Sequence, residues 1–268
     1  MSYLITGASR GIGLELVKQL LALPEPQVTK VIALSRGAPP AALQELLDNH
    51  TARSTHVTAS VDDTESVKQA AKAAEAELGD QGLDVLINNA GVFGEVFAEG
   101  ARFIAPEEML RVLDVNVVGP HRMTAAFLPL LEKGKQKKVI NMFVKSHNYR
   151  PSIGCADVRR RSSTLGSIAM SEYFTFAPVP PYKISKAALH MLNKQYALEY
   201  EGKGFTFLAV SPGWLKTDLG GPHADLDVDV GVRDVMRIIL EATPAQNGHA
   251  VGIKVSGNDR YDGKEVPW

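Results

Sequence analysis

The chain has 268 residues, 45% of them hydrophobic and 22% charged, and its formal net charge is −1. This near-neutral balance creates no overall field that would attract nucleic acid or an anionic membrane, so we expect neither as a partner. The single cysteine cannot form an internal disulfide, and the length suffices for an α/β domain whose core needs no metal. We therefore expect no metal site.

Charged residues interrupt every hydrophobic stretch, so no apolar run approaches the ~20 residues of a membrane-spanning helix. The first residues, MSYLIT, contain no basic leader followed by an apolar stretch. We expect a cytoplasmic protein.

Short apolar runs rich in β-branched residues alternate with amphipathic stretches along the chain. The expected strands are residues 3–6, 28–34, 56–61, 83–88, 138–142, 205–210 and 250–255. The expected helices are residues 11–23, 40–49, 62–78, 106–132, 181–201 and 228–242. Strands that are apolar on both faces and separated by helices indicate a parallel sheet covered on both sides. No Pro/Ser/Gly-rich linker divides the chain, so residues 1–268 are predicted to form one doubly wound α/β domain with about seven strands.

The first expected strand runs into a glycine-rich turn, TGASRGIG at residues 6–13, which opens directly into a helix. Glycines at such a turn allow a tight bend and let the backbone approach a pyrophosphate, which then meets the N–H groups at the helix N-terminus. A glycine turn without a ligand is the alternative. The strand before the turn and the helix after it favour the binding function.

The Gly-x-x-x-Gly-x-Gly spacing of this turn resembles the short-chain dehydrogenase/reductase family, and further motifs of that family follow in the same order. They are Asn88-Asn89-Ala90-Gly91 (NNAG), Asn116 in the long helix, Tyr182 to Lys186 (YxxSK), and Ser211-Pro212-Gly213 with Thr217 (PGxxxT). The resemblance implies a single-domain Rossmann fold that binds a nicotinamide cofactor. It also implies a set of cofactor-binding residues: Gly7, Ser9, Arg10, Gly11, Ile12, Gly13, Arg36, Asn89, Ala90, Gly91, Tyr182, Lys186, Pro212, Gly213 and Thr217.

The end of the second expected strand indicates which cofactor is used. An acidic residue there binds the ribose 2′-OH of NAD, whereas this strand ends in Ser35-Arg36. Arg10 adds a second cation, and the family uses basic residues at both positions for NADP. The planar guanidinium suits a phosphate, so we predict NADP(H); solvated loop arginines are the alternative. Where the family commonly has an Asp-Val pair that contacts the adenine, this chain has Ser60-Val61, which leaves the adenine contact open.

Tyr182 and Lys186 are four residues apart in a segment that begins with two prolines, so their side chains should share one face of a helix. A phenol has a pKa near ~10 in water, and a neighbouring ammonium should lower it. The resemblance implies that Tyr182 protonates the substrate oxygen, that Lys186 lowers the pKa of Tyr182 and holds the ribose, and that Asn116 anchors a proton-relay water. A serine at the end of the fifth strand should hydrogen-bond the substrate oxygen.

That serine is displaced in this chain. Residues 143–161, FVKSHNYRPSIGCADVRRR, have no helix or strand period and separate the fifth strand from SSTLGSI. Without this atypical insertion the family motif would be continuous, and Ser163 is the candidate catalytic serine. Three interpretations stay open: the insertion loops out and returns Ser163 to the strand end, it displaces the serine and impairs the enzyme, or it is a short translated intron.

The segment between Ser163 and Tyr182 is rich in apolar and aromatic residues, which suggests a hydrophobic substrate. The C-terminal residues of the chain, YDGKEVPW at 261–268, together with the SSTLGSI run, resemble the subgroup with sniffer-type carbonyl reductases, C-factor proteins and norsolorinic acid ketoreductase-like enzymes. We therefore predict an NADPH-dependent carbonyl reductase for a hydrophobic carbonyl or alcohol. The alternative is a cofactor-binding protein whose catalysis the insertion impairs. The resemblance also implies that the helices predicted at 106–132 and 181–201 can form a homo-oligomer interface.

Overall fold

The structure is a computed structural model of the chain and describes all residues except 95–103, 144–165, 175–177 and 268. In this part of the chain, seven parallel strands form one sheet in the order β3-β2-β1-β4-β5-β6-β7. Their bounds are β1 Ser2–Thr6, β2 Lys30–Ser35, β3 Ser54–Thr58, β4 Val85–Asn88, β5 Lys138–Met142, β6 Thr206–Ser211 and β7 Ala250–Gly252. The predicted doubly wound α/β fold is confirmed.

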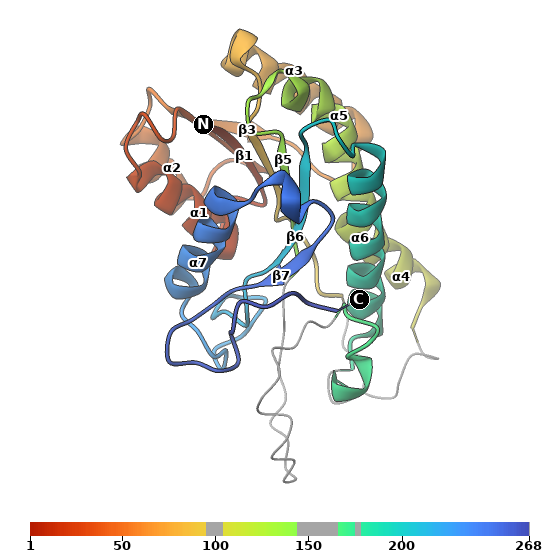
Figure 1. Ribbon diagram of the computed structural model, residues 1–268. Helices are drawn as coiled ribbons and strands as arrows, with labels where there is room; N and C mark the ends of the chain where they lie inside the picture. Colours follow the sequence, from red (N-terminus) through yellow and green to blue (C-terminus); the bar gives the residue numbers. More distant parts are fainter. Residues whose placement is uncertain (95–103, 144–165, 175–177, 268) are drawn as a thin grey trace.

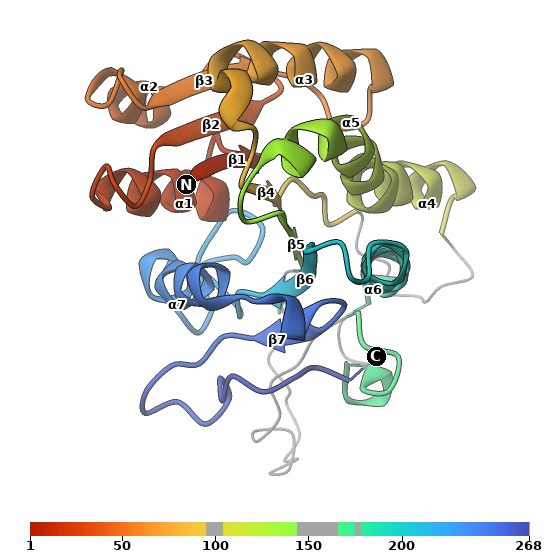
Figure 2. The same cartoon turned by 45° about the horizontal axis from the view of Figure 1, so that its top comes forward.

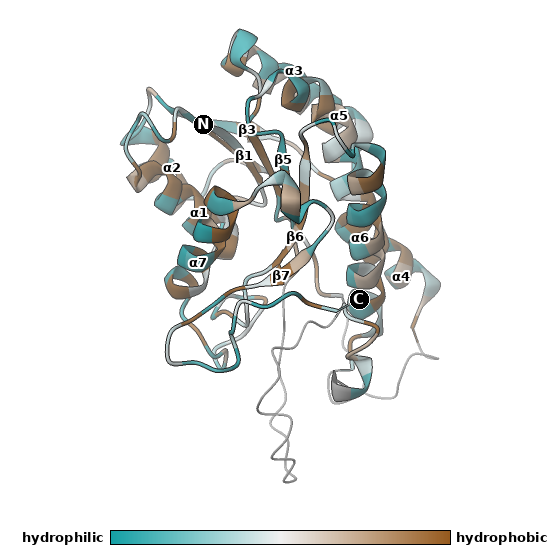
Figure 3. Ribbon diagram, in the orientation of Figure 1, coloured by the Kyte–Doolittle hydropathy of each residue, from teal (hydrophilic) through white to brown (hydrophobic). Residues whose placement is uncertain are grey.

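Helices cover both faces of the sheet (Figures 1 and 2). On one face lie α1 Gly11–Ala22, α2 Ala41–Asp48 and α7 Val228–Glu241, and on the other lie α3 Thr64–Leu78, α5 Gly119–Lys133 and α6 Pro180–Glu199. Alternate residues of a strand point to opposite faces, so Tyr3 and Ile5 of β1 pack under α1 and α7 while Leu4 packs under α3 and α5. The central strand β1 is therefore hydrophobic on both faces, and Figure 3 shows the hydrophobic residues in brown along the inner strands.

The stretch predicted as a helix at 106–132 is helical throughout, but a π-helical turn over Asp114–Val118 divides it into α4 Pro106–Leu113 and α5. The backbone N–H of Gly119 reaches back five residues to the carbonyl of Asp114. Such a widened turn cannot be read from hydrophobic spacing, because the apolar residues keep nearly the same period through it. A single π turn inside a helix is frequently found at a functional site, and Asn116 lies in this one.

Two predicted strands end earlier than expected, because each ends with its pairing partner. The strand predicted at 56–61 is β3, Ser54–Thr58, which ends opposite Ser35, the last residue of β2. The strand predicted at 250–255 is β7, whose three residues lie opposite the last three residues of β6. In the described part of the chain, no helix is both long and apolar enough to cross a membrane.

The strand order reverses between β1 and β4, since β2 lies on one side of β1 and β4 on the other. In open α/β sheets, ligands bind in the crevice at the carboxyl ends of the strands where the order reverses. The glycine turn follows the end of β1 and the NNAG segment begins at the end of β4. The fold therefore brings these two motifs together at the expected position.

Candidate active site

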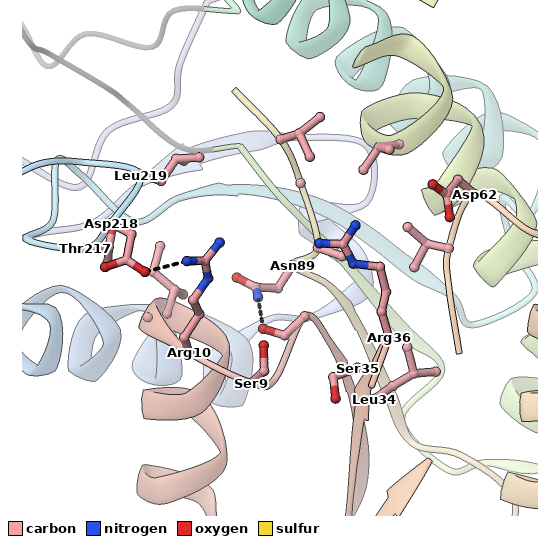
Figure 4. A pocket seen from close by; sticks show the side chains of 18 of the residues that line it. Ser9, Arg10, Leu34, Ser35, Arg36, Asp62, Asn89, Thr217, Asp218 and Leu219 are labelled. Atoms are coloured by element: carbon pink, nitrogen blue, oxygen red, sulfur yellow. Dashed lines mark hydrogen bonds and ion pairs between the residues drawn. The ribbon is translucent and has the colours of Figure 1, made fainter. Parts of the chain in front are cut away.

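A cavity of about 290 Å³ opens at the carboxyl ends of β1, β2 and β4 (Figure 4). It is lined by ten of the residues predicted to bind the cofactor: Gly7, Ser9, Arg10, Gly11, Ile12, Arg36, Asn89, Ala90, Gly91 and Thr217. The other lining residues are Leu34, Ser35, Ala59, Val61, Asp62, Val92, Val115, Asp218 and Leu219. The remaining predicted residues, Gly13, Tyr182, Lys186, Pro212 and Gly213, are not among those that line the cavity.

The conformation of the glycine turn requires glycine at positions 7 and 13. Gly7 has φ +67°, in the left-handed region, and a Cβ on Gly13 would lie 2.2 Å from the carbonyl oxygen of Gly7. The side chain of Asn89 donates to the carbonyl oxygen of Thr6 at 2.9 Å, and the hydroxyl of Thr6 accepts from the backbone N–H groups of Asn89 and Ala90 at 3.0 Å. The NNAG segment thus holds the turn in place and leaves its outer side to the cavity.

A chain of hydrogen bonds between buried amide side chains connects Asn88 of the NNAG segment to β5, α6 and β6. Asn88 donates to Asn141 at 2.9 Å, Asn141 donates to Asn193 at 2.9 Å, and Asn193 donates to the carbonyl oxygen of Phe207 at 3.3 Å. Buried amides are stable only where they are hydrogen-bonded. These hydrogen bonds therefore fix β4 against β5 and α6.

The charges around the cavity are of both signs. Arg10 and Arg36 extend toward it from the start of α1 and from the end of β2 (Figure 4). Nη1 of Arg10 lies 2.5 Å from a carboxylate oxygen of Asp218, and both side chains are 73% exposed. Such an exposed pair contributes little stability, so the arginine can exchange this partner for an anionic ligand. Asp62, which accepts a hydrogen bond from Ser60, also lines the cavity.

Tyr182 and Lys186 lie on the buried face of α6, as their spacing predicts. Tyr182 is 1% exposed and packs with Met170, Val179 and the ring of Phe93, whose centroid is 5.0 Å from its own. The ammonium of Lys186 lies 5.5 Å from the centroid of the Tyr182 ring. Its Nζ donates to the carbonyl oxygen of Met142, at the end of β5, at 3.2 Å.

Burial lowers the pKa of Lys186 to about 8. His190, one turn further along α6, is 1% exposed, and its ring contacts Phe143 with centroids 4.4 Å apart. Burial, and then the charge of Lys186, lowers the pKa of His190 to about 4, so this imidazole is neutral at pH 7. No motif in the sequence marks His190 as part of this buried group.

Asn116 is completely buried, and its side chain joins three segments. Its amide oxygen accepts from the N–H of Val92 at 2.8 Å, and its amide nitrogen donates to the carbonyl oxygen of Val92 at 2.8 Å and to the hydroxyl of Ser185 at 3.0 Å. Ser185 in turn donates to the carbonyl oxygen of Tyr182 at 2.7 Å. The π turn therefore ties the segment after β4 to the first turn of α6.

Gly91 connects this buried cluster to the cavity. It lines the cavity, and a Cβ on it would lie 3.2 Å from Oδ1 of Asn116 and 3.8 Å from Nζ of Lys186. Asn116 and Lys186 therefore lie directly behind the cavity wall at Gly91.

Ser163 lies outside the described residues, as do all residues of the predicted insertion except Phe143. Phe143 is 1% exposed, packs with Ala209, Ala250 and Val266, and continues the pairing of β5 through its N–H, which donates to the carbonyl oxygen of Val210 at 3.0 Å. The described chain resumes at Gly166, where a Cβ would lie 2.6 Å from Cβ of Lys186. Among the described residues, no three His, Cys, Asp or Glu side chains gather as metal ligands.

The residues of the cavity fit a dinucleotide, because residues of the glycine turn and of the N-terminus of α1 line it, and a helix N-terminus favours a phosphate. Arg10 and Arg36 can each donate hydrogen bonds to a phosphate group. The end of β2 carries no carboxylate that would repel that phosphate. This fit is independent of any resemblance.

A sequence profile described as short chain dehydrogenase matches residues 2–153, more than half of the chain. The short-chain dehydrogenase/reductase atnB of Arthrinium sp is 36% identical over 225 residues, which cover 81% of this chain and 75% of that protein. C-signal of Myxococcus xanthus is 33% identical over 186 residues, which cover 69% of this chain and 93% of that protein.

Solved structures show the same similarity across the whole chain. The NADPH-bound carbonyl reductase from chicken fatty liver superposes with a TM-score of 0.80 at 31% identity, covering 100% of this chain and 98% of that one. The carbonyl reductase Sniffer of D. melanogaster superposes with a TM-score of 0.82 at 30% identity, covering 100% of this chain and 99% of that one.

Proposed function

The chain belongs to the short-chain dehydrogenase family, and from this premise we propose that it is an NADPH-dependent oxidoreductase that interconverts a hydrophobic carbonyl compound and its alcohol. The observation that carries the proposal is that Asn116 and Lys186, the latter beside Tyr182, lie directly behind Gly91, which lines a cavity suited to a dinucleotide. When bound, the reduced nicotinamide supplies a hydride.

The residues of the chain perform the remaining steps. Tyr182 donates its phenolic proton to the carbonyl oxygen of the substrate as that oxygen gains negative charge. Lys186 provides a positive charge beside the tyrosine ring, and this charge stabilises the phenolate that remains. Asn116 holds the segment after β4 through Val92 and so keeps Gly91 and the tyrosine in register.

Ser163 is the proposed hydrogen-bond donor to the substrate oxygen. The packing of Gly166 on Lys186 supports this assignment, since Gly166 belongs to the same SSTLGSI run. The apolar cluster of Met170, Val179 and Phe93 around Tyr182 supports a hydrophobic substrate. A cytoplasmic location and a homo-oligomer stay predictions; for the latter, α6 presents the exposed apolar side chains Ile184, Met191 and Leu198 at seven-residue intervals.

Two measurements on the purified protein test the proposed function. A change in NADPH fluorescence on mixing reports binding, and oxidation of NADPH with a panel of aromatic ketones and quinones reports turnover. Binding with turnover is expected. Absence of both would overturn the proposal.

Binding without turnover would favour the alternative of a cofactor-binding protein impaired by residues 143–161. Deletion of these residues should then restore turnover. Because Phe143 is buried beside Ala250 and Val266, a second deletion of residues 144–161 that retains it separates loss of the insertion from loss of a core ring.

The preference for NADPH is expected to depend on Arg36. Arg36→Gln removes one charged donor from the cavity, and a charge-assisted hydrogen bond to phosphate contributes about 1.5–3 kcal/mol. The dissociation constant for NADPH should therefore rise by about 10- to 100-fold, while that for NADH stays nearly unchanged. Arg233→Gln, at a 74% exposed arginine on α7, is the matched control. Equal losses for both cofactors would contradict a 2′-phosphate contact.

A further inference from the structure

The loop between β6 and α7, residues 214–226, forms one wall of the cofactor cavity. Thr217, Asp218 and Leu219 near its tip line the cavity. The two ends of this cofactor loop are hydrogen-bonded to each other: the N–H of Leu226 donates to the carbonyl oxygen of Trp214 at 3.2 Å, and the N–H of Lys216 donates to that of Leu226 at 2.9 Å. The direction in which the tip points is therefore set at the base.

Tyr261 joins both ends of the loop from outside it. Its hydroxyl accepts the backbone N–H of Trp214 at 3.2 Å and donates to a carboxylate oxygen of Asp225 at 3.1 Å. Asp225 also accepts from the guanidinium of Arg260, with both oxygens at 3.0 Å from the same nitrogen. A single phenolic oxygen thus connects the first residue of the cofactor loop to one of its last.

The ring of Tyr261 is fixed independently of its hydroxyl. It is 3% exposed and belongs to the core cluster that contains Leu215 and Leu226. Its backbone pairs with the segment after β7, because the N–H of Val255 donates to the carbonyl oxygen of Tyr261 at 2.8 Å. The ring also lies against Gly213, whose φ is +82° and where a Cβ would lie only 2.7 Å from Cε1 of Tyr261.

We propose that Tyr261 is a positioning residue for cofactor binding, whose hydroxyl orients the cofactor loop so that residues 217–219 form their wall of the cavity. The inference rests on the proposed function, because it concerns the same cavity. The C-terminal segment then contributes to cofactor affinity although none of its residues lines the cavity in the described part of the chain.

Tyr261→Phe tests the proposal, since it removes the hydroxyl and keeps the ring against Gly213. The N–H of Trp214 loses its acceptor, and hydrogen exchange of the cofactor loop in the protein without cofactor should become faster. The dissociation constant for NADPH should rise by up to about tenfold, the effect of losing one hydrogen bond that holds the loop. Tyr3→Phe is the matched control, because Tyr3 on β1 is also buried and its hydroxyl donates to the sulfur of Met1 rather than to a residue of the cofactor loop.

A pair of substitutions at Asp225 supplies a second test that leaves the tyrosine intact. Asp225→Ala removes the acceptor of the phenolic proton and should loosen the loop, whereas Asp225→Asn retains an acceptor oxygen and should restore slower exchange and most of the affinity. If the contact between Tyr261 and Asp225 only stabilised the fold, both Asp225 variants would have a lower unfolding temperature, and they would not differ in loop exchange or in NADPH affinity.

The results separate this inference from the proposed function. Unchanged loop exchange in Tyr261→Phe would overturn the inference whether or not the protein binds NADPH. Faster exchange with unchanged NADPH affinity would overturn the positioning role. If the wild-type protein binds neither NADPH nor NADH, the proposed function is overturned, and so is the role of Tyr261 in positioning the loop for a cofactor. Hydrogen exchange in Tyr261→Phe would still show whether the hydroxyl holds the loop.

Discussion

Replacing Tyr182 by phenylalanine is expected to lower kcat for carbonyl reduction by about 10²- to 10⁴-fold, the usual contribution of a positioned proton donor. The ring of Tyr182 packs against Phe93, Met170 and Val179, and phenylalanine preserves this packing. The affinity for NADPH and the unfolding temperature should therefore change little. Steady-state kinetics with a ketone substrate and NADPH titration measure the two effects.

Tyr196→Phe is the control on the same helix. The hydroxyl of Tyr196 hydrogen-bonds Nδ1 of His121 of α5 at 2.8 Å, and we expect its loss to leave kcat within a few-fold of the wild-type value. A Tyr182→Phe protein that turns over as fast as the wild type would show that another group donates the proton.

Replacing Lys186 by methionine is expected to reduce turnover by roughly 100-fold or more, because the positive charge beside the phenolic ring is lost, and to make the folded protein more stable at pH 7. The pKa of Lys186 is lowered from 10.5 to about 8 by burial. The unfolded chain therefore binds more protons than the folded protein between pH 8 and 10.5, so the charge of Lys186 opposes folding below this window.

The size of the stabilisation follows from the same shift. It amounts to at most about 3 kcal/mol at pH 7, and the loss of the hydrogen bond to the carbonyl oxygen of Met142 reduces it. The stability of the wild type should rise as the pH increases from 8 to 10.5, and the advantage of Lys186→Met should shrink over the same range. Denaturant unfolding at pH 7 and pH 10 measures both. Lys194→Met, on the same helix but outside the site, serves as control, and a less stable Lys186→Met protein at pH 7 would contradict the argument.

The fold could be predicted because its strands are apolar on both faces. Tyr3, Leu4 and Ile5 are completely buried in the structure, and a run of this kind requires helices on both sides of the sheet. The glycine turn was equally predictable, since Gly7 and Gly13 meet backbone atoms where no side chain fits. Tyr182 and Lys186 share a helix face because four residues make about one turn.

Other parts of the site could not be predicted from spacing along the chain. Asn116 could be named as a candidate from its motif, but its bonds to Val92 and Ser185 depend on a π turn that hydrophobic spacing does not reveal. His190 carries no motif, and its low pKa arises only from burial beside Lys186. Phe143, predicted as the first residue of an insertion, is a core residue through its contacts with Ala250 and Val266.

The sequence by itself determined the fold class, the family motifs and the helix face that carries Tyr182 and Lys186, because each of these depends on residues close together in the chain. Only the tertiary structure decided which distant residues are in contact: Arg10 with Asp218 at the cavity, and Tyr261 with Trp214 and Asp225 at the base of the cofactor loop. The physical reason is that a hydrogen bond or ion pair is specified by atoms in space. Arg10 and Asp218, which are 208 positions apart, can therefore form an ion pair that no periodic pattern in the sequence indicates.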